Sequence, residues 1–408
     1  MKDELGHRRI GRRTLLKAFS IIGTGLAAGM FRRNSLSAGS SNYSTSTSKI
    51  PIIDITDLYH PYQDPGDNFD LIAAYGLPEV DLRAVILDVT DEYRKPGDPR
   101  QKPEYRDETG PRDPGIIPVM QLNYIFDRNV PFGIAPFTRM KSPDDKMLDV
   151  PKFQQFGIEL ILKVLKESEQ KVEILSFGSA RALAAAYNRE PKLLREKVRK
   201  IHLSAGSSSP EFLEWNVMLD PKAIVCLLSS DLPIAIYPCG TGKGAFDLGP
   251  NNSYYLLENL NFISQMDSKL QRYAAYSFER LTRPDFINFL EEDLPLEVLN
   301  RICSRRHNVW ETALWAQVSR RKLVQRADGT YRLIPQAEIK PGDIVLPNNL
   351  VSCKIKVRDD GIFTFEKTKE KSNFEIYERG DSEINQKAMR EALAALYISF
   401  SPSLSPKK

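Results

Sequence analysis

Five aspartates near the start of the chain are the residues whose types and spacing could do chemistry. They are Asp54, Asp57, Asp64, Asp67 and Asp70, all within 17 residues. Hard cations such as Ca²⁺ bind several oxygen ligands, and clustered carboxylates supply them. Asp67 and Asp70 are three residues apart, so they share one face if a helix begins there. The competing interpretation is a solvated acidic loop whose aspartates cap a helix, because Asp is common at such positions.

The elements around these aspartates favour a cation site. The run PIIDITD is short, apolar and ends in acids, as a buried strand does, and DLRAVILDVTD predicts a second buried strand. A helix is expected between them, over residues 69–75. In parallel sheets, ligands bind beyond the carboxyl ends of the strands, and the aspartates follow such an end.

Strands and helices alternate in the segments that follow. Strands are predicted in VEILSF, KVRKIHLSAG and LPIAIYPC, and helices over residues 153–170, in ARALAAAYN and in DPKAIVCLLSS. The alternation predicts an α/β fold with three layers, α/β/α, around a mostly parallel, Rossmann-like sheet. Residues 251–302 look helical, with breaks at Pro284 and Pro295. Near the C-terminus we expect two hairpins that turn at Asp-Gly pairs, KLVQRADGTYRLI and KIKVRDDGIFTFE, and a final helix in EINQKAMREALAALYISF.

Five segments, in order and over about residues 50–400, resemble the nucleoside hydrolase family. IIDITD with DPGDNFDLIAAY is similar to the family's opening strand and its D-T-D-P-G-x-D-D motif, with YHPYQ inserted. PEVDLRAVILDVTD is similar to the family's next strand. The stretch that begins with VEILSF and ends with LSAG is similar to a family segment made of a strand, G-P-L-T-N, a helix and a strand that ends in M-G-G. Glu214-Trp215-Asn216 with Asp220-Pro221 matches E-F-N-x-x-x-D-P, the most specific of the five, and HNVWETALWA is similar to H-D-P-L-A-V-A.

The resemblance implies a calcium-dependent hydrolase of N-glycosidic bonds in nucleosides or related ribosides. In that family calcium holds two sugar hydroxyls and the water that attacks the anomeric carbon, and an opening aspartate takes the proton. Carried over residue by residue, the resemblance implies that Asp57 is the catalytic base, with Asp64 as the second candidate because of the insertion. It implies that calcium is bound by Asp67, Asp70, Glu311 and the backbone carbonyl of Arg181. It also implies that Glu214 and Asn216 bind the ribose. The register of the aspartates stays open, because the family's adjacent Asp-Asp becomes Asp67-Asn68 or, shifted by three, Asp70-Leu71.

The chain also departs from the family pattern. Trp310 stands where many relatives carry the histidine that helps the base leave. His60 or His307 is an alternative acid, although a lone histidine is more often structural, and Trp310 offers a face on which a base or a sugar stacks. The second hypothesis is therefore a non-catalytic sugar- or nucleoside-binding protein that keeps the fold and the metal site. A third, a purely structural aspartate cluster, is disfavoured by the matching Glu-x-Asn segment.

The N-terminal segment is predicted to be an export signal. Residues 12–17, RRTLLK, followed by an uncharged stretch too short to span a bilayer, resemble a twin-arginine signal. We therefore expect a signal over residues 1–38, a Ser/Thr-rich linker over 39–49 and a nucleoside hydrolase-like domain over 50–408. The protein would be exported by the twin-arginine translocase to the periplasm or the extracellular space, or stay anchored if the leader is not cleaved. The competing interpretation is a basic N-terminal helix of a cytosolic protein.

Charge and cysteine content limit the classes of partner. Of the formal net charge of +4, residues 1–38 carry +6, which leaves −2 for the rest of the chain. A nearly neutral body has no electrostatic footprint for nucleic acid. The four cysteines show no metal-binding spacing, so buried free thiols are expected, with one disulfide as the alternative. Analogy with the family adds a homo-oligomer as a further possibility.

Overall fold

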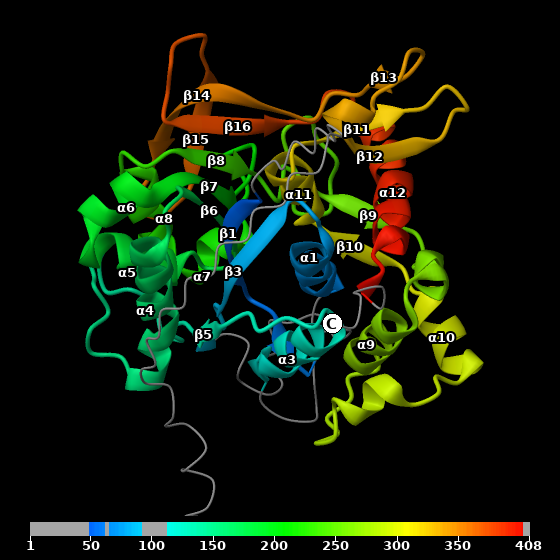
Figure 1. Cartoon of the computed structure of the whole chain (residues 1–408). Coiled ribbons are helices and arrows are strands. Elements are labelled where there is room, and N and C mark those ends of the chain that lie inside the picture. The colour runs from blue at the N-terminus through cyan, green and yellow to red at the C-terminus, as the bar shows by residue number, and fades with distance from the viewer. Residues whose placement is uncertain (1–48, 62–64, 92–111, 403–408) are drawn as a thin grey trace, which may run out of the picture. The chain divides into compact units, whose positions relative to one another are not determined.

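A nine-stranded, mostly parallel sheet organises the part of the chain that the computed structural model describes, residues 49–61, 65–91 and 112–402 (Figure 1). Its order is β15-β14-β16-β8-β7-β6-β1-β3-β5. All neighbours from β16 to β5 pair in parallel, and β14 pairs antiparallel with β15 and β16. The strands are β1 Ile50–Thr56, β3 Val80–Leu87, β5 Phe132–Ile134, β6 Val172–Phe177, β7 Val198–Ser204, β8 Ile234–Tyr237, β14 Asn349–Val357, β15 Phe363–Lys367 and β16 Phe374–Glu378.

Helices cover both faces of this sheet and give it the three predicted layers. One face packs against α1 Pro65–Gly76, α3 Ile116–Ile125, α9 Ser268–Phe278, α10 Leu296–Cys303, α11 Thr312–Val318 and α12 Ser382–Ser399. The other packs against α4 Lys152–Glu167, α5 Arg181–Arg189, α6 Pro191–Lys197 and α8 Pro221–Leu228, and α7 Trp215–Leu219 precedes α8 (Figure 1). Along β1, Ile52 belongs to the first core and Ile53 to the second. A strand buried on both faces reads as a continuous apolar run, which is why PIIDIT was recognisable.

Smaller sheets complete the fold. β11 Arg321–Gln325, β12 Tyr331–Pro335 and β13 Ile344–Val345 form an antiparallel sheet, while β9 Tyr255–Leu257 pairs with β10 His307–Val309 and β2 Tyr59–His60 with β4 Asp113–Pro114. Both predicted hairpins are present, and each turns through a glycine of positive φ, Gly329 and Gly361. Short 3₁₀ helices span Asn261–Gln265, Asn288–Glu291 and Gln336–Glu338.

The prediction that residues 251–302 are helical is wrong in part. The segment contains strand β9 and two 3₁₀ helices besides α9 and α10. Helix α10 begins directly after Pro295, as the predicted break required. The strand escaped prediction because β9 pairs with β10, about fifty residues later in the chain, and long-range pairing overrides local propensity.

The parallel strands end at a common edge of the sheet. Asp57 follows β1, Asp88 follows β3, Ser179 lies two residues beyond β6, Cys239 two residues beyond β8, and Arg379 follows β16. Because the carboxyl ends of parallel strands meet at one edge, these residues from distant segments become neighbours.

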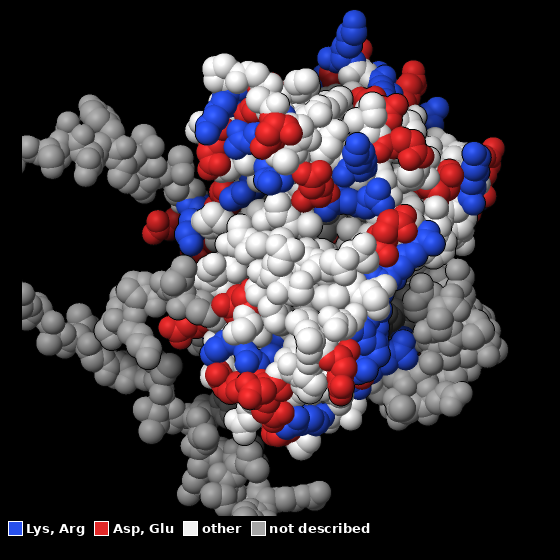
Figure 2. All heavy atoms as spheres, turned by 90° about the vertical axis from the view of Figure 1, so that its right-hand side faces the viewer, with Lys and Arg blue, Asp and Glu red and all other residues white. Residues whose placement is uncertain are grey.

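One face of the molecule carries charges of both signs, and the thiols lie in the interior. On the face shown in Figure 2, positive and negative side chains are interspersed around a broad uncharged area, so that face has no patch of a single sign. All four cysteines are buried and free, which confirms the expected thiols. Within the described residues, no helix combines the length and apolar composition needed to cross a membrane. The predicted signal segment lies outside the described residues.

Candidate functional site

Three carboxyl groups from distant parts of the chain gather around the buried thiol of Cys239. Burial raises the pKa of this thiol, and the carboxylates of Glu214, Glu311 and Asp57 raise it further. The Ser204 hydroxyl, at the end of β7, lies 3.3 Å from the sulfur. We call Asp57, Glu214 and Glu311 the site carboxyls. All three were singled out from the sequence, and the structure brings them together at the carboxyl edge of the sheet.

Glu214 caps helix α7 and ties it to the end of β7. Its carboxylate accepts hydrogen bonds from the backbone amides of Gly206 at 2.7 Å, Asn216 at 3.0 Å and Val217 at 3.3 Å. Burial raises its pKa to about 7, although these amides oppose the shift. The Asn216 side chain donates to the Ser204 carbonyl at 2.8 Å. Both predicted ribose-binding residues therefore shape this strand end, and Glu214 can exchange a proton near neutral pH.

Asp88 is a functional candidate that the sequence analysis did not select. A Cβ added at Gly178 would lie 3.0 Å from Asp88 Oδ2 and 3.1 Å from the Asp57 Cβ, so the two aspartates flank this glycine. The Ser179 hydroxyl donates to Asp88 Oδ2 at 2.8 Å. Burial raises the Asp88 pKa, opposed by Arg181 and Ser179. The signal was its place at the end of the second apolar strand, the same place that Asp57 occupies after the first.

Behind Glu311 lies a second pair of carboxyls, Asp54 and Asp70, which we call the inner pair. Burial raises the pKa of Asp54 to about 7. Burial, and then Asp54, raises the pKa of Asp70, which accepts a hydrogen bond from Trp315 Nε1. Glu311 raises the Asp70 pKa further. Two carboxyls that are buried side by side cannot both ionise cheaply, so burial and their proximity favour the protonated form of one of them.

Glu311 adjoins a group of three rings. Its Oε2 accepts the Trp310 backbone amide at 3.0 Å, and burial raises its pKa. The Trp310 ring lies 5.8 Å from Phe246 and 5.6 Å from Tyr254, between ring centroids, and Trp310 Nε1 donates to the Ala245 carbonyl. We call Phe246, Tyr254 and Trp310 the aromatic cluster. Phe246 is 48% exposed, so a ligand can reach the cluster.

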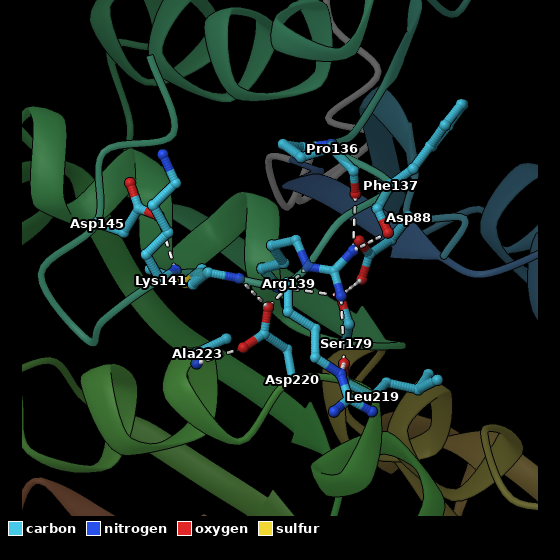
Figure 3. A network of polar contacts seen from close by, with 12 residues as sticks. Asp88, Pro136, Phe137, Arg139, Lys141, Asp145, Ser179, Leu219, Asp220 and Ala223 are labelled. Carbon is cyan, nitrogen blue, oxygen red and sulfur yellow. Dashed lines mark hydrogen bonds and ion pairs between the residues drawn. The ribbon is translucent and has the colours of Figure 1, made fainter. Parts of the chain in front are cut away.

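The Arg181 side chain belongs to a network of polar contacts with Asp220 and the carbonyls of Pro136, Phe137 and Leu219. Figure 3 labels these four partners. It is fully buried, and its Nε lies 2.7 Å from Asp220 Oδ2. Its remaining donors reach the carbonyls of Pro136, Phe137 and Leu219. Asp220 also accepts the backbone amides of Met140 and Ala223. The side chain therefore braces helices α5 and α8 beneath the site, while the predicted ligand is its backbone carbonyl.

The remaining predicted ligands lie at the start of α1. Asp67 is buried in the first turn, and Asp67 and Asp70 both raise the pKa of Tyr273, which burial raises first. The Tyr273 hydroxyl donates to Asn68 Oδ1 at 2.9 Å. Asp67 and Asp70 thus share the face predicted from their spacing. Asp64 lies outside the described residues.

Comparison with known proteins gives one sequence match. No family model matches the chain. Over 84 residues, 20% of this chain, it is 32% identical to a pyrimidine-specific ribonucleoside hydrolase, RihA, of Enterobacter sp. (strain 638). The match spans 26% of that relative's length. Over this fifth of the chain, the match supports the resemblance to nucleoside hydrolases.

Solved structures similar to this chain carry related names. An inosine-guanosine nucleoside hydrolase aligns with a TM-score of 0.49 and 15% identity, over 85% of this chain and 99% of its own. A purine-preferring ribonucleoside hydrolase from Gardnerella vaginalis aligns with a TM-score of 0.48 and 12% identity, over 85% and 99%.

The carboxyls provide calcium donors of the right kind, but not a finished site. Both carboxylate oxygens of Asp54, Asp70 Oδ2 and Asp88 Oδ1 are buried and have no hydrogen-bond partner among the described residues. Buried oxygens without partners are costly unless a cation or a ligand donor reaches them. In residues 49–61, 65–91 and 112–402, no three His, Cys, Asp or Glu side chains are placed to hold a metal ion together.

Burial lowers the pKa of both histidines that were considered as substitute acids. Burial, with Arg305, lowers the pKa of His307 to about 4, and its ring lies 5.7 Å from Phe278. Burial also lowers the pKa of His60, whose ring stacks on Tyr276. Their packing and lowered pKa values fit structural roles better than proton donation to a leaving group.

Proposed function

We propose that this protein hydrolyses N-glycosidic bonds of nucleosides or related ribosides, and that it requires calcium. The observation that carries the proposal is the gathering of Asp57, Glu214 and Glu311 around Cys239 at the carboxyl edge of a parallel sheet. Ligands of such sheets bind at that edge. The 84-residue match to a protein named as a ribonucleoside hydrolase supports the same activity.

The site carboxyls and Asp88 suit this chemistry. Asp57 would take the proton of the attacking water, with Asp64 as the second candidate. The negative charge of the carboxylates would stabilise the positive charge that develops on the sugar ring as the glycosidic bond breaks. Glu214, with its raised pKa, would bind the ribose hydroxyls together with Asn216. Calcium, held by Asp67, Asp70, Glu311 and the Arg181 carbonyl, would supply a positive charge that orients the sugar hydroxyls and the water.

The aromatic cluster would bind the leaving group. Its three rings stand beside Glu311, and stacking on an aromatic base is worth about 0.5–1.5 kcal/mol beyond burial. Trp310, already held by its bond to Ala245, offers a preorganised face. Nucleosides, whose leaving group is a flat heterocycle, are therefore the substrate class that we propose.

A second candidate is a sugar- or nucleoside-binding protein without turnover. Two observations favour it: Trp310 occupies the place of the family's leaving-group histidine, and Asn68, bonded to Tyr273, follows Asp67 where the family has a second aspartate. This candidate keeps the aromatic cluster and the site carboxyls as a binding site.

Export is a further part of the proposal. It rests on the sequence RRTLLK and the uncharged stretch after it, which lie outside the described residues. The twin-arginine translocase would carry the folded protein across the membrane. Self-association into a homo-oligomer is proposed by analogy alone.

Ribose release from uridine, cytidine, inosine and adenosine tests the activity. With the full chain and calcium, we expect release from at least one nucleoside, and its loss when a chelator is added. Asp57→Asn should lower kcat by roughly 100-fold or more, because a positioned base contributes 10²–10⁴-fold. Asp231→Asn is the matched control, since Asp231 is exposed, pairs with Arg195 and lies before β8, at the opposite edge of the sheet.

The outcomes separate the two candidates. Release that survives Asp57→Asn unchanged would remove Asp57 from the catalytic role. Nucleoside binding measured by calorimetry without any release would instead establish the second candidate.

A further inference from the structure

Arg379 is a fully buried arginine at the carboxyl edge of the sheet, directly after β16. Its Nε donates to the Asn252 carbonyl at 2.6 Å, and its Nη2 donates to the Tyr254 carbonyl at 2.7 Å. Its backbone amide donates to the Pro250 carbonyl at 2.9 Å. The guanidinium also lies 4.7 Å from the Tyr255 ring centroid. One side chain thus binds the segment from residue 250 to residue 255 at several points.

The surroundings of Arg379 differ from those of Arg181, which is also fully buried. Arg181 pairs with the carboxylate of Asp220. The acceptors found for Arg379 among the described residues are carbonyl and amide oxygens, and its Nη1 is buried without a hydrogen-bond partner there. Burying a guanidinium without a counter-charge costs free energy. Its planar fork can hold two carbonyls that are two residues apart, which an ammonium group cannot do in the same way.

The segment that Arg379 holds carries the aromatic cluster. Tyr254 belongs to the cluster, and its hydroxyl donates to Asn308 at 2.8 Å. The Asn252 side chain donates to the Asp247 carbonyl at 2.7 Å and accepts the Gly249 amide, which fixes the loop next to Phe246. Arg379 is therefore hydrogen-bonded to Tyr254 directly and is linked to the loop next to Phe246 through Asn252.

We propose that Arg379 is a positioning residue that sets the arrangement of the aromatic cluster, and through it the affinity for the aromatic part of the substrate. The inference rests on the proposed function for its substrate. It adds that base recognition depends on the guanidinium group at the end of β16, in a part of the chain to which the proposed function assigns no sugar-binding residue.

The test compares Arg379→Met with Arg321→Met in the full chain. Arg321 is a matched control because it is also mostly buried and donates to a carbonyl, that of Leu333, but lies on β11, in another sheet. Arg379→Met should raise KM for the nucleoside, or its Kd, about tenfold, with kcat changed less than twofold and ribose affinity unchanged. Arg379→Lys should recover part of the affinity.

Two results would overturn the proposal. One is an equal loss of affinity for nucleoside and for ribose; the other is a fall in kcat with KM unchanged. If Arg379→Met does not fold, Asn252→Ala replaces it, because that variant breaks the link to the loop of Phe246 while the arginine stays, and the same shift in KM is expected.

A readout without turnover separates this inference from the proposed function. The chain has three tryptophans. The fluorescence emission of Trp310 is therefore obtained by subtracting the spectrum of Trp310→Phe from the spectrum of the wild type. If no riboside is hydrolysed, the proposed function fails, but Arg379→Met should still shift the Trp310 emission to longer wavelength as the cluster loosens, whereas Arg321→Met should not. Unchanged Trp310 emission in Arg379→Met would refute the positioning role.

Discussion

Two groups of buried ionisable side chains lie within the same α/β fold and differ in how their charges are balanced. In the first, Arg181 and Asp220 carry opposite charges, are both fully buried and satisfy each other together with backbone carbonyls and amides. In the second, the site carboxyls and the inner pair bring together groups of like charge, and burial raises the pKa values of Asp54, Asp70, Glu214 and Glu311. The first group is complete without a ligand, whereas among the described residues no Lys or Arg forms an ion pair with Asp54, Asp70, Glu214 or Glu311.

The contrast indicates which charges serve the fold and which serve a ligand. A satisfied buried ion pair is costly to break, although it adds little net stability. A concentration of carboxyls with raised pKa values is costly to keep, and such groups are typical of functional sites. Among the described residues, no hydrogen-bond donor reaches Asp54 Oδ1 or Asp70 Oδ2 of the inner pair, and a positive charge would stabilise such buried oxygens.

Removing one charge from each group should give the largest difference. Asp220→Asn leaves the Arg181 guanidinium buried without its counter-charge, so we expect a loss of about 3–5 kcal/mol in the free energy of unfolding. Asp54→Asn relieves a like-charge contact and should change this free energy by less than about 1 kcal/mol in either direction. Urea denaturation at pH 8 measures both. A loss below about 1 kcal/mol in Asp220→Asn would show that the pair does not brace the fold.

Calcium should act on one of these groups and leave the other unchanged. An ion that binds the folded state at a hundred times its Kd stabilises it by about 2.7 kcal/mol. We expect calcium to raise the melting temperature of the wild type, and Asp67→Asn to abolish the increase, with Asp231→Asn as the control. An increase that persists in Asp67→Asn would show that the ion binds elsewhere and that Asp67 on α1 is not a ligand.

The pH dependence of stability should show the most gradual change of the three, because it is spread over more than two pH units. Burial raises the Glu214 pKa to about 7, above its ordinary value of 4.5, so the folded state binds more protons than the unfolded state between these values. The contribution of Glu214 to stability is therefore complete below about pH 4.5 and is lost as the pH rises towards 7, by at most about 1.4 kcal/mol per pH unit. Glu214→Gln should flatten this part of the pH–stability curve measured by urea denaturation. An unchanged slope would mean that Glu214 titrates normally.

Much of the fold was predictable because its signals are local. β1 and β6 are short apolar runs bounded by polar residues. Both hairpins turn at Asp-Gly pairs, and the positive φ of Gly329 and Gly361 favours glycine at these positions. The site was predictable less completely. Asp57, Glu214 and Glu311 were selected through a family resemblance. Asp88 and Arg379 were missed, because the role of each depends on neighbours from other strands, although Asp88 lies in a segment that resembles the family.

The sequence by itself determined the alternation of strands and helices, the turns and the placing of acids at the end of the first strand, since these depend on neighbours within a few residues. Only the tertiary structure decided which charges meet. Trp315 binds Asp70 across 245 residues of chain, and Arg379 reaches Asn252 across 127. The pKa values of the carboxyls follow from these long-range encounters, because burial and nearby charge, rather than residue type, set the cost of ionisation.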